Sequence, residues 1–260
     1  MSYNYTVSGL SDSFYEVLKQ STKVMSTGDM VGMGMKQFLL IERGSPELFL
    51  GGKVPDVLFL GQDPTIVSPR HIPVVLDLAN PAGQLHKYIF GKVCAGLNIH
   101  KSRVLAWNLV NRYFIDKPRK LAADSEVEAD LNHRFPKLWG DKGDWKTVRF
   151  LYYYFAEFGK QELDYIVDKY VPLVLVSLGE PVFRVLRYAY ALPQGTAMPE
   201  NLADFCCKLT FRIRVGQEEM LWLALPHEPT GDRNPHYKRV LADELPGVGQ
   251  HLAVELKSKA

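Results

Sequence analysis

The sequence predicts an α/β protein with three α/β/α layers around a short, mostly parallel sheet of four strands. Four short apolar runs, at residues 57–60, 104–107, 171–177 and 220–225, support this fold class. Most of them end at a glycine, a proline or a polar residue and are followed by a segment with helical spacing. Continuous apolar runs of this length are typical of parallel strands that are covered on both faces. The 260 residues, 47% of them hydrophobic, fit one domain with a sizeable core, so we expect a single domain over residues 1–260.

The sequence predicts two helical segments before the first apolar run, and a loop and a helix after it. Ser11 or Ser13 can cap a helix that reaches about residue 27, and residues 33–42 suit a second, shorter helical piece. Residues 66–81 carry three prolines and predict an ordered loop with an extended piece at 72–76. From Gly83 the apolar residues recur at spacings of three and four, which predicts a helix.

The second half begins with an expected insertion at about residues 117–170. Its first part, 117–144, is polar and is expected to hold a short helix at 125–135, whereas 146–170 predicts a long helix bent at Gly159. Pro181 suits the first turn of another helix. Residues 209–215 alternate between apolar and polar, as in a half-exposed strand, and a basic helix starts at 236–239. The pattern after residue 245 is ambiguous.

Composition restricts the function classes. The net charge of +2 is too small to indicate a polyanion partner, although a local basic patch remains compatible with it. Three cysteines form neither a disulfide framework nor a metal-ligand pattern, so we expect reduced thiols, no metal and no cofactor. The N-terminus lacks the pattern of a signal peptide, and no apolar run reaches the length of a membrane helix. We therefore expect a cytoplasmic monomer that does not insert into a membrane.

Polar side chains follow three of the four apolar runs within three residues. They are Asp63, Asn108 and His227. Parallel strands place such residues at the same edge of the sheet, the edge at which α/β proteins bind ligands. Each also has an ordinary structural interpretation, because aspartate and asparagine form turns and a histidine beside a proline often only donates a structural hydrogen bond. Their joint placement favours a functional site.

The residues around these positions resemble four motifs of the uracil-DNA glycosylase superfamily. Residues 61–64, Gly-Gln-Asp-Pro, look like its water-activating motif, and 104–108 resemble its strand ending in a base-reading asparagine. Residues 173–179 are similar to its next strand, which ends in glycine before a helix. Residues 223–227, followed by Glu-Pro-Thr, resemble the motif whose histidine opens a DNA-binding loop. The resemblance covers roughly residues 57–109 and 173–238, in the family's order.

The resemblance implies a monofunctional DNA glycosylase of base excision repair, acting on uracil or another damaged base flipped out of DNA. Asp63 would orient water and stabilise the sugar cation, His227 would stabilise the departing base, and Asn108 would read its edge. No metal or cofactor is needed. The other implied site residues are Gly61, Gln62, Pro64 and Thr65 around the base, and Arg233, Lys238 and Arg239 on DNA phosphates, although the three basic residues also fit a solvated helix face.

Three departures from the family pattern keep other functions open. Thr65 stands where the best-known uracil-specific branch has a tyrosine that excludes thymine, residues 73–78 contain no aromatic to stack on the base, and Glu228 and Asp232 place acids in the DNA-binding loop. The second hypothesis is a nucleic-acid-binding member of the fold with little or no glycosylase activity. The third is an unrelated doubly wound hydrolase of a small ligand.

Overall fold

The computed structural model describes residues 48–63, 65–67, 72–74, 76, 78, 81–110, 128–129, 145–190, 201–208, 211–227 and 234–258. The helices expected before residue 43, and most of the polar segment 117–144, lie outside these residues. The strands are β1 (Phe49–Leu50), β2 (Val57–Gly61), β3 (Thr65–Val67), β4 (Ile72–Val74), β5 (Val104–Asn108), β6 (Val174–Leu178), β7 (Arg212–Val215) and β8 (Glu218–Leu225). The helices are α3 (Gln84–His86), η1 (Lys87–Cys94), η2 (Lys101–Arg103), α6 (Trp145–Tyr154), η3 (Phe155–Gly159), α7 (Lys160–Tyr170), α8 (Glu180–Ala189), α9 (Leu202–Phe205), α11 (Pro235–Asp243) and α12 (Leu245–Ser258).

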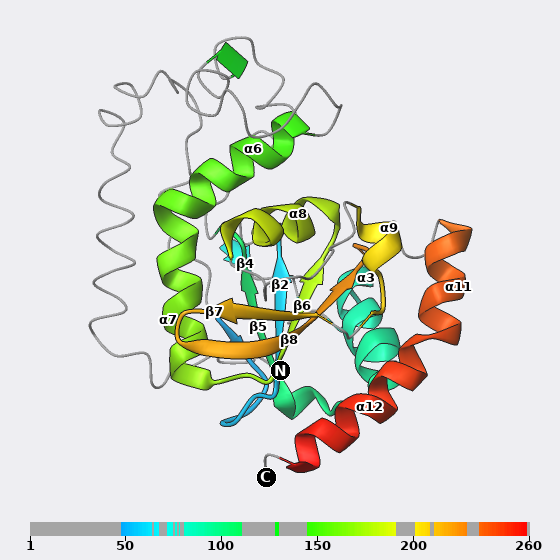
Figure 1. The fold of residues 1–260 in the computed structure, drawn as a ribbon. Coiled ribbons are helices and arrows are strands. Elements are labelled where there is room, and N and C mark those ends of the chain that lie inside the picture. Colours follow the sequence, from blue (N-terminus) through cyan, green and yellow to red (C-terminus); the bar gives the residue numbers. More distant parts are fainter. Residues whose placement is uncertain are drawn as a thin grey trace.

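The main sheet has six strands in the order β1-β5-β2-β6-β8-β7 (Figure 1). The four expected strands, β5, β2, β6 and β8, are its parallel centre. The α/β class is therefore confirmed, but the expectation of four strands was wrong. β1 and β7 add antiparallel pairs at the two edges. β1 has only two residues, too few to show any strand pattern in the sequence.

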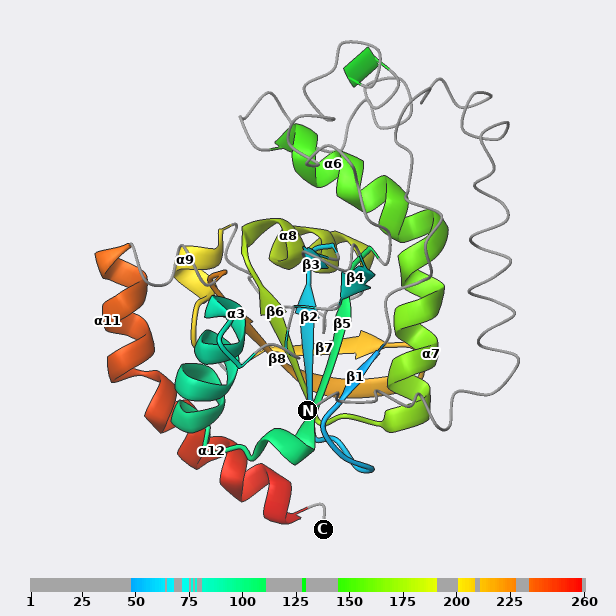
Figure 2. The same cartoon turned by 180° about the vertical axis from the view of Figure 1, so that it is seen from behind.

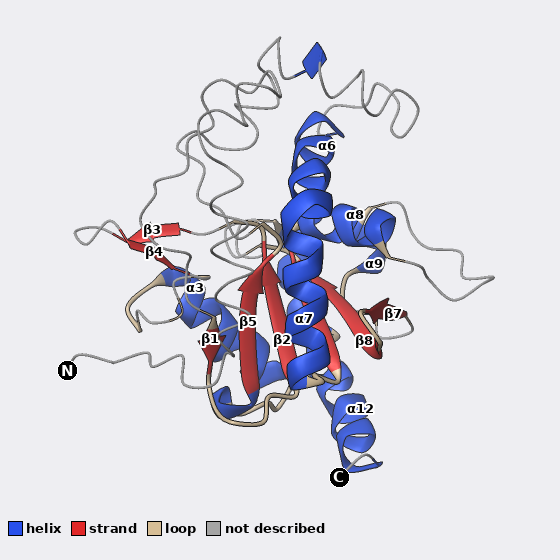
Figure 3. Ribbon diagram, turned by 90° about the vertical axis from the view of Figure 1, so that its left-hand side faces the viewer, coloured by secondary structure: helices blue, strands red, loops and turns tan. Residues whose placement is uncertain are grey.

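Burial explains why the central strands are continuous apolar runs. Every residue of β2, β5 and β6 is buried. Helices lie on both sides of the sheet: α6 and α7 on one side, η1 and α12 on the other (Figures 1 and 2). Figure 3 shows α7 in front of the sheet, running roughly along the strands. A strand covered on both faces has no polar side to alternate with, and this accounts for the sequence pattern.

The segment after β2 forms a second, two-stranded sheet where the sequence predicted a loop. β3 and β4 pair antiparallel, with Ile66 opposite Pro73. Pro73 lacks a backbone N–H, so proline favours a loop or an edge strand. Both strands of a two-stranded sheet are edges, and this geometry tolerates the proline. The extended piece expected at 72–76 is confirmed over 72–74.

The long helix expected over 146–170 is confirmed, and it is interrupted at the expected place. The π-helical turn η3 ends at Gly159, between α6 and α7. A Cβ at Gly159 would lie 2.1 Å from the carbonyl oxygen of Leu109, the residue that follows β5. Glycine is therefore required for the helix to approach the end of β5. The ambiguous tail after residue 245 is helix α12.

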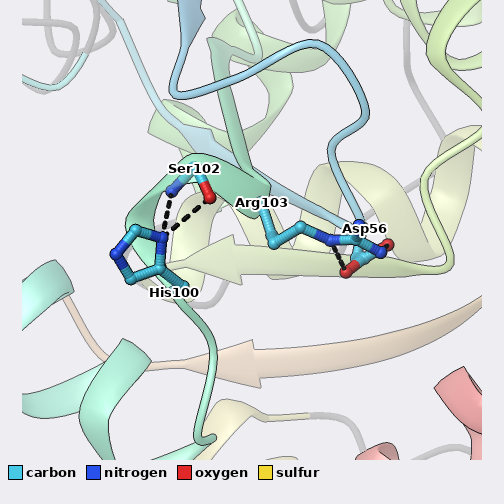
Figure 4. Close-up of polar contacts among 4 residues, drawn as sticks. All are labelled: Asp56, His100, Ser102 and Arg103. Atoms are coloured by element: carbon cyan, nitrogen blue, oxygen red, sulfur yellow. Dashed lines mark hydrogen bonds and ion pairs between the residues drawn. The ribbon is translucent and has the colours of Figure 1, made fainter.

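Polar contacts fix the amino ends of the strands, opposite the edge where the predicted site residues lie. Arg103 donates two hydrogen bonds to the carboxylate of buried Asp56 (Figure 4). The Asp56 carbonyl accepts the amides of Leu173 and Val174, at 2.8 and 3.1 Å. Asp56 therefore ties the start of β2 to the residues that begin β5 and β6. Next to it, His100 caps the short helix η2, with its Nδ1 2.7 Å from the Ser102 hydroxyl (Figure 4).

A second polar cluster attaches the β7–β8 turn to helix α7. We call Asp164 and Asp168 the α7 carboxylates. Asp164 Oδ1 accepts the hydroxyl of Tyr190 at 2.8 Å and the amide of Gly216 at 3.1 Å. Asp168 Oδ1 accepts the amide of Gln217 at 2.8 Å. Burial and the adjacent carboxylate raise the pKa of Tyr190, so its hydroxyl stays protonated and donates.

Candidate functional site

The three predicted site residues lie at the carboxyl ends of β2, β5 and β8: Asn108 is the last residue of β5, and Asp63 and His227 come two residues after β2 and β8. Gly61 of β2 is in register with Asn108 of β5, and Leu178 of β6 is in register with Leu225 of β8. The strand ends are therefore level, and Asp63, Asn108 and His227 lie along the same edge of the sheet. β6 lies between β2 and β8, which puts two strand spacings, about 10 Å, between their backbones. The arrangement suits joint action on one ligand rather than a directly bonded catalytic pair.

Asn108 is the most informative residue of this edge. It is completely buried, and in the described part of the chain neither its Nδ2 nor its Oδ1 has a hydrogen-bond partner. Buried polar groups in proteins are nearly always paired, and an unpaired one costs about 1–3 kcal/mol. The amide is one donor and one acceptor side by side, held on the end of a rigid strand. That is the geometry needed to bind a ligand edge that offers an N–H next to a C=O.

Gly61 and Leu76 lie next to this amide. A Cβ at Gly61 would be 2.9 Å from Asn108 Oδ1 and 2.2 Å from Leu76 Cδ2, so a larger residue at 61 would displace one or both. Glycine in the Gly-Gln-Asp-Pro motif therefore has a local reason: it leaves space for two side chains at the strand end. Leu76 is buried and has a left-handed backbone, with φ 53°.

The loop that carries Asp63 is bonded to the end of β5. Gly61 and Gln62 accept the amides of Leu109 and Val110 at 2.7 and 3.0 Å, which continues the β2–β5 pairing past both strands. Gln62 Nε2 donates to Asp63 Oδ1 at 2.8 Å. This bond holds the half-buried carboxylate in one orientation. The structure thus gives Gln62 a role in positioning Asp63.

His227 is positioned by contacts from two other elements. Tyr88 on η1 donates its hydroxyl to the carbonyl of Pro226 at 2.8 Å, immediately before the histidine. The Gly179 amide bonds the carbonyl of Leu225 at 2.8 Å, and a Cβ at Gly179 would lie 3.4 Å from His227 Cβ. His227 is exposed as a whole residue, yet desolvation by the surrounding atoms lowers the pKa of its imidazole. His227 is thus favoured in its neutral form near pH 7.

The other predicted site residues are placed as follows. Thr65 begins β3, directly after the loop that carries Asp63. Lys238 and Arg239 are exposed on α11, which Asn234 caps by accepting the His236 amide at 2.9 Å. Pro64 and Arg233 lie outside the described residues, as do Glu228 and Asp232.

The described residues contain no group of three or more His, Cys, Asp or Glu that could hold a metal ion. Cys94, Cys206 and Cys207 are buried free thiols, and burial raises the pKa of Cys94 to about 12. No helix in the described ranges is long and apolar enough to cross a membrane.

Two residues of the site were missed by the sequence analysis. Tyr88 lies 138 residues before Pro226, and its spacing in a helical pattern indicated only a core position. Leu76 was assigned to the end of an extended piece, with no sign of contact with Gly61. The absence of an aromatic at 73–78 concerns the same segment, but the contact of Leu76 with Gly61 depends on the tertiary fold.

No protein-family model matches this chain, and no curated protein is significantly similar to it.

Proposed function

We propose that this chain is a DNA glycosylase-like hydrolase that cleaves the N-glycosidic bond of uracil or another damaged base flipped out of DNA. Its catalytic residues are Asp63 and His227, and Asn108 reads the base. Gly61, Gln62 and Thr65 surround the base, together with Pro64. Lys238, Arg239 and Arg233 contact DNA phosphates.

The buried, unpartnered amide of Asn108 is the observation that carries the proposal. A protein that gained nothing from this amide would be more stable with an apolar residue there. Its position in register with Gly61 puts it beside the loop of Asp63. A base edge with an N–H next to a C=O would satisfy both atoms of the amide. Uracil has such an edge, and so do several deaminated bases.

In the proposed hydrolysis, Asp63 acts on the sugar and on the attacking water. The bond between C1′ and the base nitrogen breaks, and the nitrogen keeps the bonding pair. Asp63 stabilises the positive charge that develops on the sugar and orients a water. The water oxygen then bonds to C1′ and releases its proton to the carboxylate or to solvent. The orientation of Asp63 by Gln62, at 2.8 Å, supports this role.

His227 stabilises the negative charge on the departing base. A neutral imidazole donates an N–H to the base oxygen on which the charge develops, and the lowered pKa favours this neutral form. The Tyr88 bond to the Pro226 carbonyl and the bond from the Gly179 amide to the Leu225 carbonyl hold the backbone before the histidine at the strand end. Fixed donors of this kind lower the barrier because they need no reorganisation during the reaction.

The test is base release from oligonucleotides that carry uracil or a panel of deaminated and alkylated bases, single- and double-stranded. Asp63→Asn is expected to lower the release rate by at least about 10²-fold while DNA binding persists, because it removes the charge that stabilises the sugar cation. His227→Ala is expected to lower it as well. Lys238→Ala on the exposed face of α11 is the matched variant: it is expected to weaken DNA binding at low salt and leave the cleavage step unchanged.

A nucleic-acid-binding protein without turnover is the second candidate. The contact of Leu76 with Gly61 favours it, because an aliphatic side chain and not an aromatic one lies beside the base-reading amide. DNA binding without release of any base would select this function. If the protein shows neither salt-dependent DNA binding nor base release, the remaining candidate is an unrelated hydrolase of a small ligand.

A further inference from the structure

The side chains of Asn108 and Leu76 both lie beside Gly61, at the carboxyl end of β2. Leu76 Cδ2 and Asn108 Oδ1 both lie within 3 Å of one point, the position of a Cβ on Gly61. Leu76 Cγ is 3.1 Å from the same point. Leu76 itself is only 4% exposed. An aliphatic side chain therefore packs against the strand end on the same side of Gly61 as the carboxamide oxygen of Asn108.

This packing gives the amide no hydrogen bond. A leucine side chain has neither donor nor acceptor, so the contact excludes water without replacing it. The two polar atoms of Asn108 remain unsatisfied in the described structure. A ligand that bonds the amide from the side of Gly61 must take the space of the Leu76 methyl groups.

The backbone of Leu76 is suited to such a movement. Its φ of 53° is in the left-handed region, which is uncommon for residues other than glycine and asparagine. Residues held in this region depend on their surroundings, and here the side chain's packing on Gly61 supplies part of that support. Withdrawal of Leu76 would exchange this packing for contact between the ligand and the strand end.

We propose that Leu76 covers the carboxamide of Asn108 and withdraws when a ligand binds there, which makes it a specificity-determining residue of the site. The inference rests on the proposed function in taking the Asn108 amide as the group that reads the ligand. A flat ring with adjacent N–H and C=O groups offers two hydrogen bonds and enough apolar contact to replace the leucine. Water or a small ion offers no such contact and does not displace it.

The experiment measures hydrogen exchange of the Asn108 side-chain amide with water, by NMR of ¹⁵N-labelled protein. Asn108→Ala assigns the resonance. Leu76→Gly removes the cover and suits a left-handed backbone, so it removes the side chain without straining the chain. Val171→Gly is the matched control, since Val171 also has a left-handed backbone, with φ 47°, but lies at the end of α7 and is exposed. Leu76→Ala takes the place of Leu76→Gly if the glycine variant does not fold.

Exchange at least tenfold faster in Leu76→Gly, and unchanged in Val171→Gly, is the expected result. Exchange as slow as in the wild type would overturn the inference. In the base-release assay, Leu76→Gly is expected to lower the preference for the best base over the next by at least fivefold, and an unchanged preference would also count against it. The exchange measurement needs no catalysis. Faster exchange in a protein that releases no base would support the covering role of Leu76 and contradict the proposed glycosylase activity. Slow exchange in an enzyme that does release base would contradict the covering role and support the glycosylase activity.

Discussion

Two polar regions of this molecule differ in whether their buried polar groups have hydrogen-bond partners. At the α7 carboxylates, Asp164 accepts a buried tyrosine hydroxyl and a backbone amide, and Lys160 adds an ion pair at 2.6 Å. At the carboxyl edge of the sheet, the amide of Asn108 is completely buried and has no partner in the described residues. The first region has several hydrogen bonds and an ion pair, and these bonds hold helix α7 to the β7–β8 turn. The second has unused bonding capacity, at the edge where α/β proteins bind ligands.

We expect this difference to separate residues that stabilise the fold from residues kept for a ligand. A residue of the first kind should lower stability when truncated, because its partners are left unpaired. One of the second kind should lower function at little or no loss of stability. The following variants test this contrast from the largest expected effect to the smallest.

Gly216→Ala is expected to disturb the α7 carboxylates most. Gly216 has φ 58°, and a Cβ there would lie 2.3 Å from Asp168 Oδ1. The carboxylate must shift and release the Gln217 amide, and the left-handed backbone becomes strained. We expect a loss of about 2 kcal/mol of unfolding free energy, measured by denaturant titration. Gly247→Ala on α12 is the control: nothing lies within 4 Å of its Cβ, so alanine should be neutral or slightly stabilising in the helix. Equal losses in both variants would contradict the steric explanation.

Tyr88→Phe and Tyr190→Phe each remove one buried hydroxyl that donates a hydrogen bond of 2.8 Å. Both are expected to lower stability by about 1 kcal/mol. Only Tyr88→Phe should also slow base release, by about tenfold in kcat, because its partner carbonyl immediately precedes His227. In the His227→Ala background, Tyr88→Phe should have little further effect on kcat. Additive losses would show that Tyr88 does not act through the histidine.

The smallest expected effect is a pH dependence at His227. The pKa of the imidazole is lowered in the folded protein, so the unfolded chain binds the proton more readily. The histidine's contribution to stability is therefore complete above about pH 6.5 and is lost as the pH falls below that value. His227→Asn removes this contribution. The stability of the wild type relative to the variant should fall between pH 8 and pH 5, and a relative stability that rises over this range would show that the pKa is raised instead.

Local pattern was enough to predict the centre of the fold. Strands buried on both faces show as continuous apolar runs, and the four that were expected form the parallel part of the sheet. The edge strands were harder. β1 is two residues long, and the alternation at 209–215 indicated a strand but not the sheet that it joins. The β3–β4 pair could not be predicted, because the prolines of this segment indicate a loop. Proline is tolerated here since both strands of the pair are edges.

The candidate site likewise has residues with a local sequence signal and contacts without one. The placement of Asp63, Asn108 and His227 at one edge of the sheet could be predicted because each follows an apolar run, and a polar residue after such a run is a local signal. The contacts of Leu76 with Gly61 and of Tyr88 with Pro226 could not, since they join segments that only the tertiary fold brings together. The unpaired state of the Asn108 amide is likewise a property of the packed structure.

The most direct test of the central claim compares Asn108→Ala with Asp164→Ala. Unfolding free energy and base release are measured on the same preparations. Asp164→Ala is expected to lose about 2 kcal/mol, because Tyr190 and Gly216 lose their acceptor, and to keep base release. Asn108→Ala is expected to keep its stability or gain about 1 kcal/mol, and to lose base release by at least about 10²-fold. If Asn108→Ala is destabilised as much as Asp164→Ala and still releases base at the wild-type rate, Asn108 is a structural residue and the edge is not the site proposed.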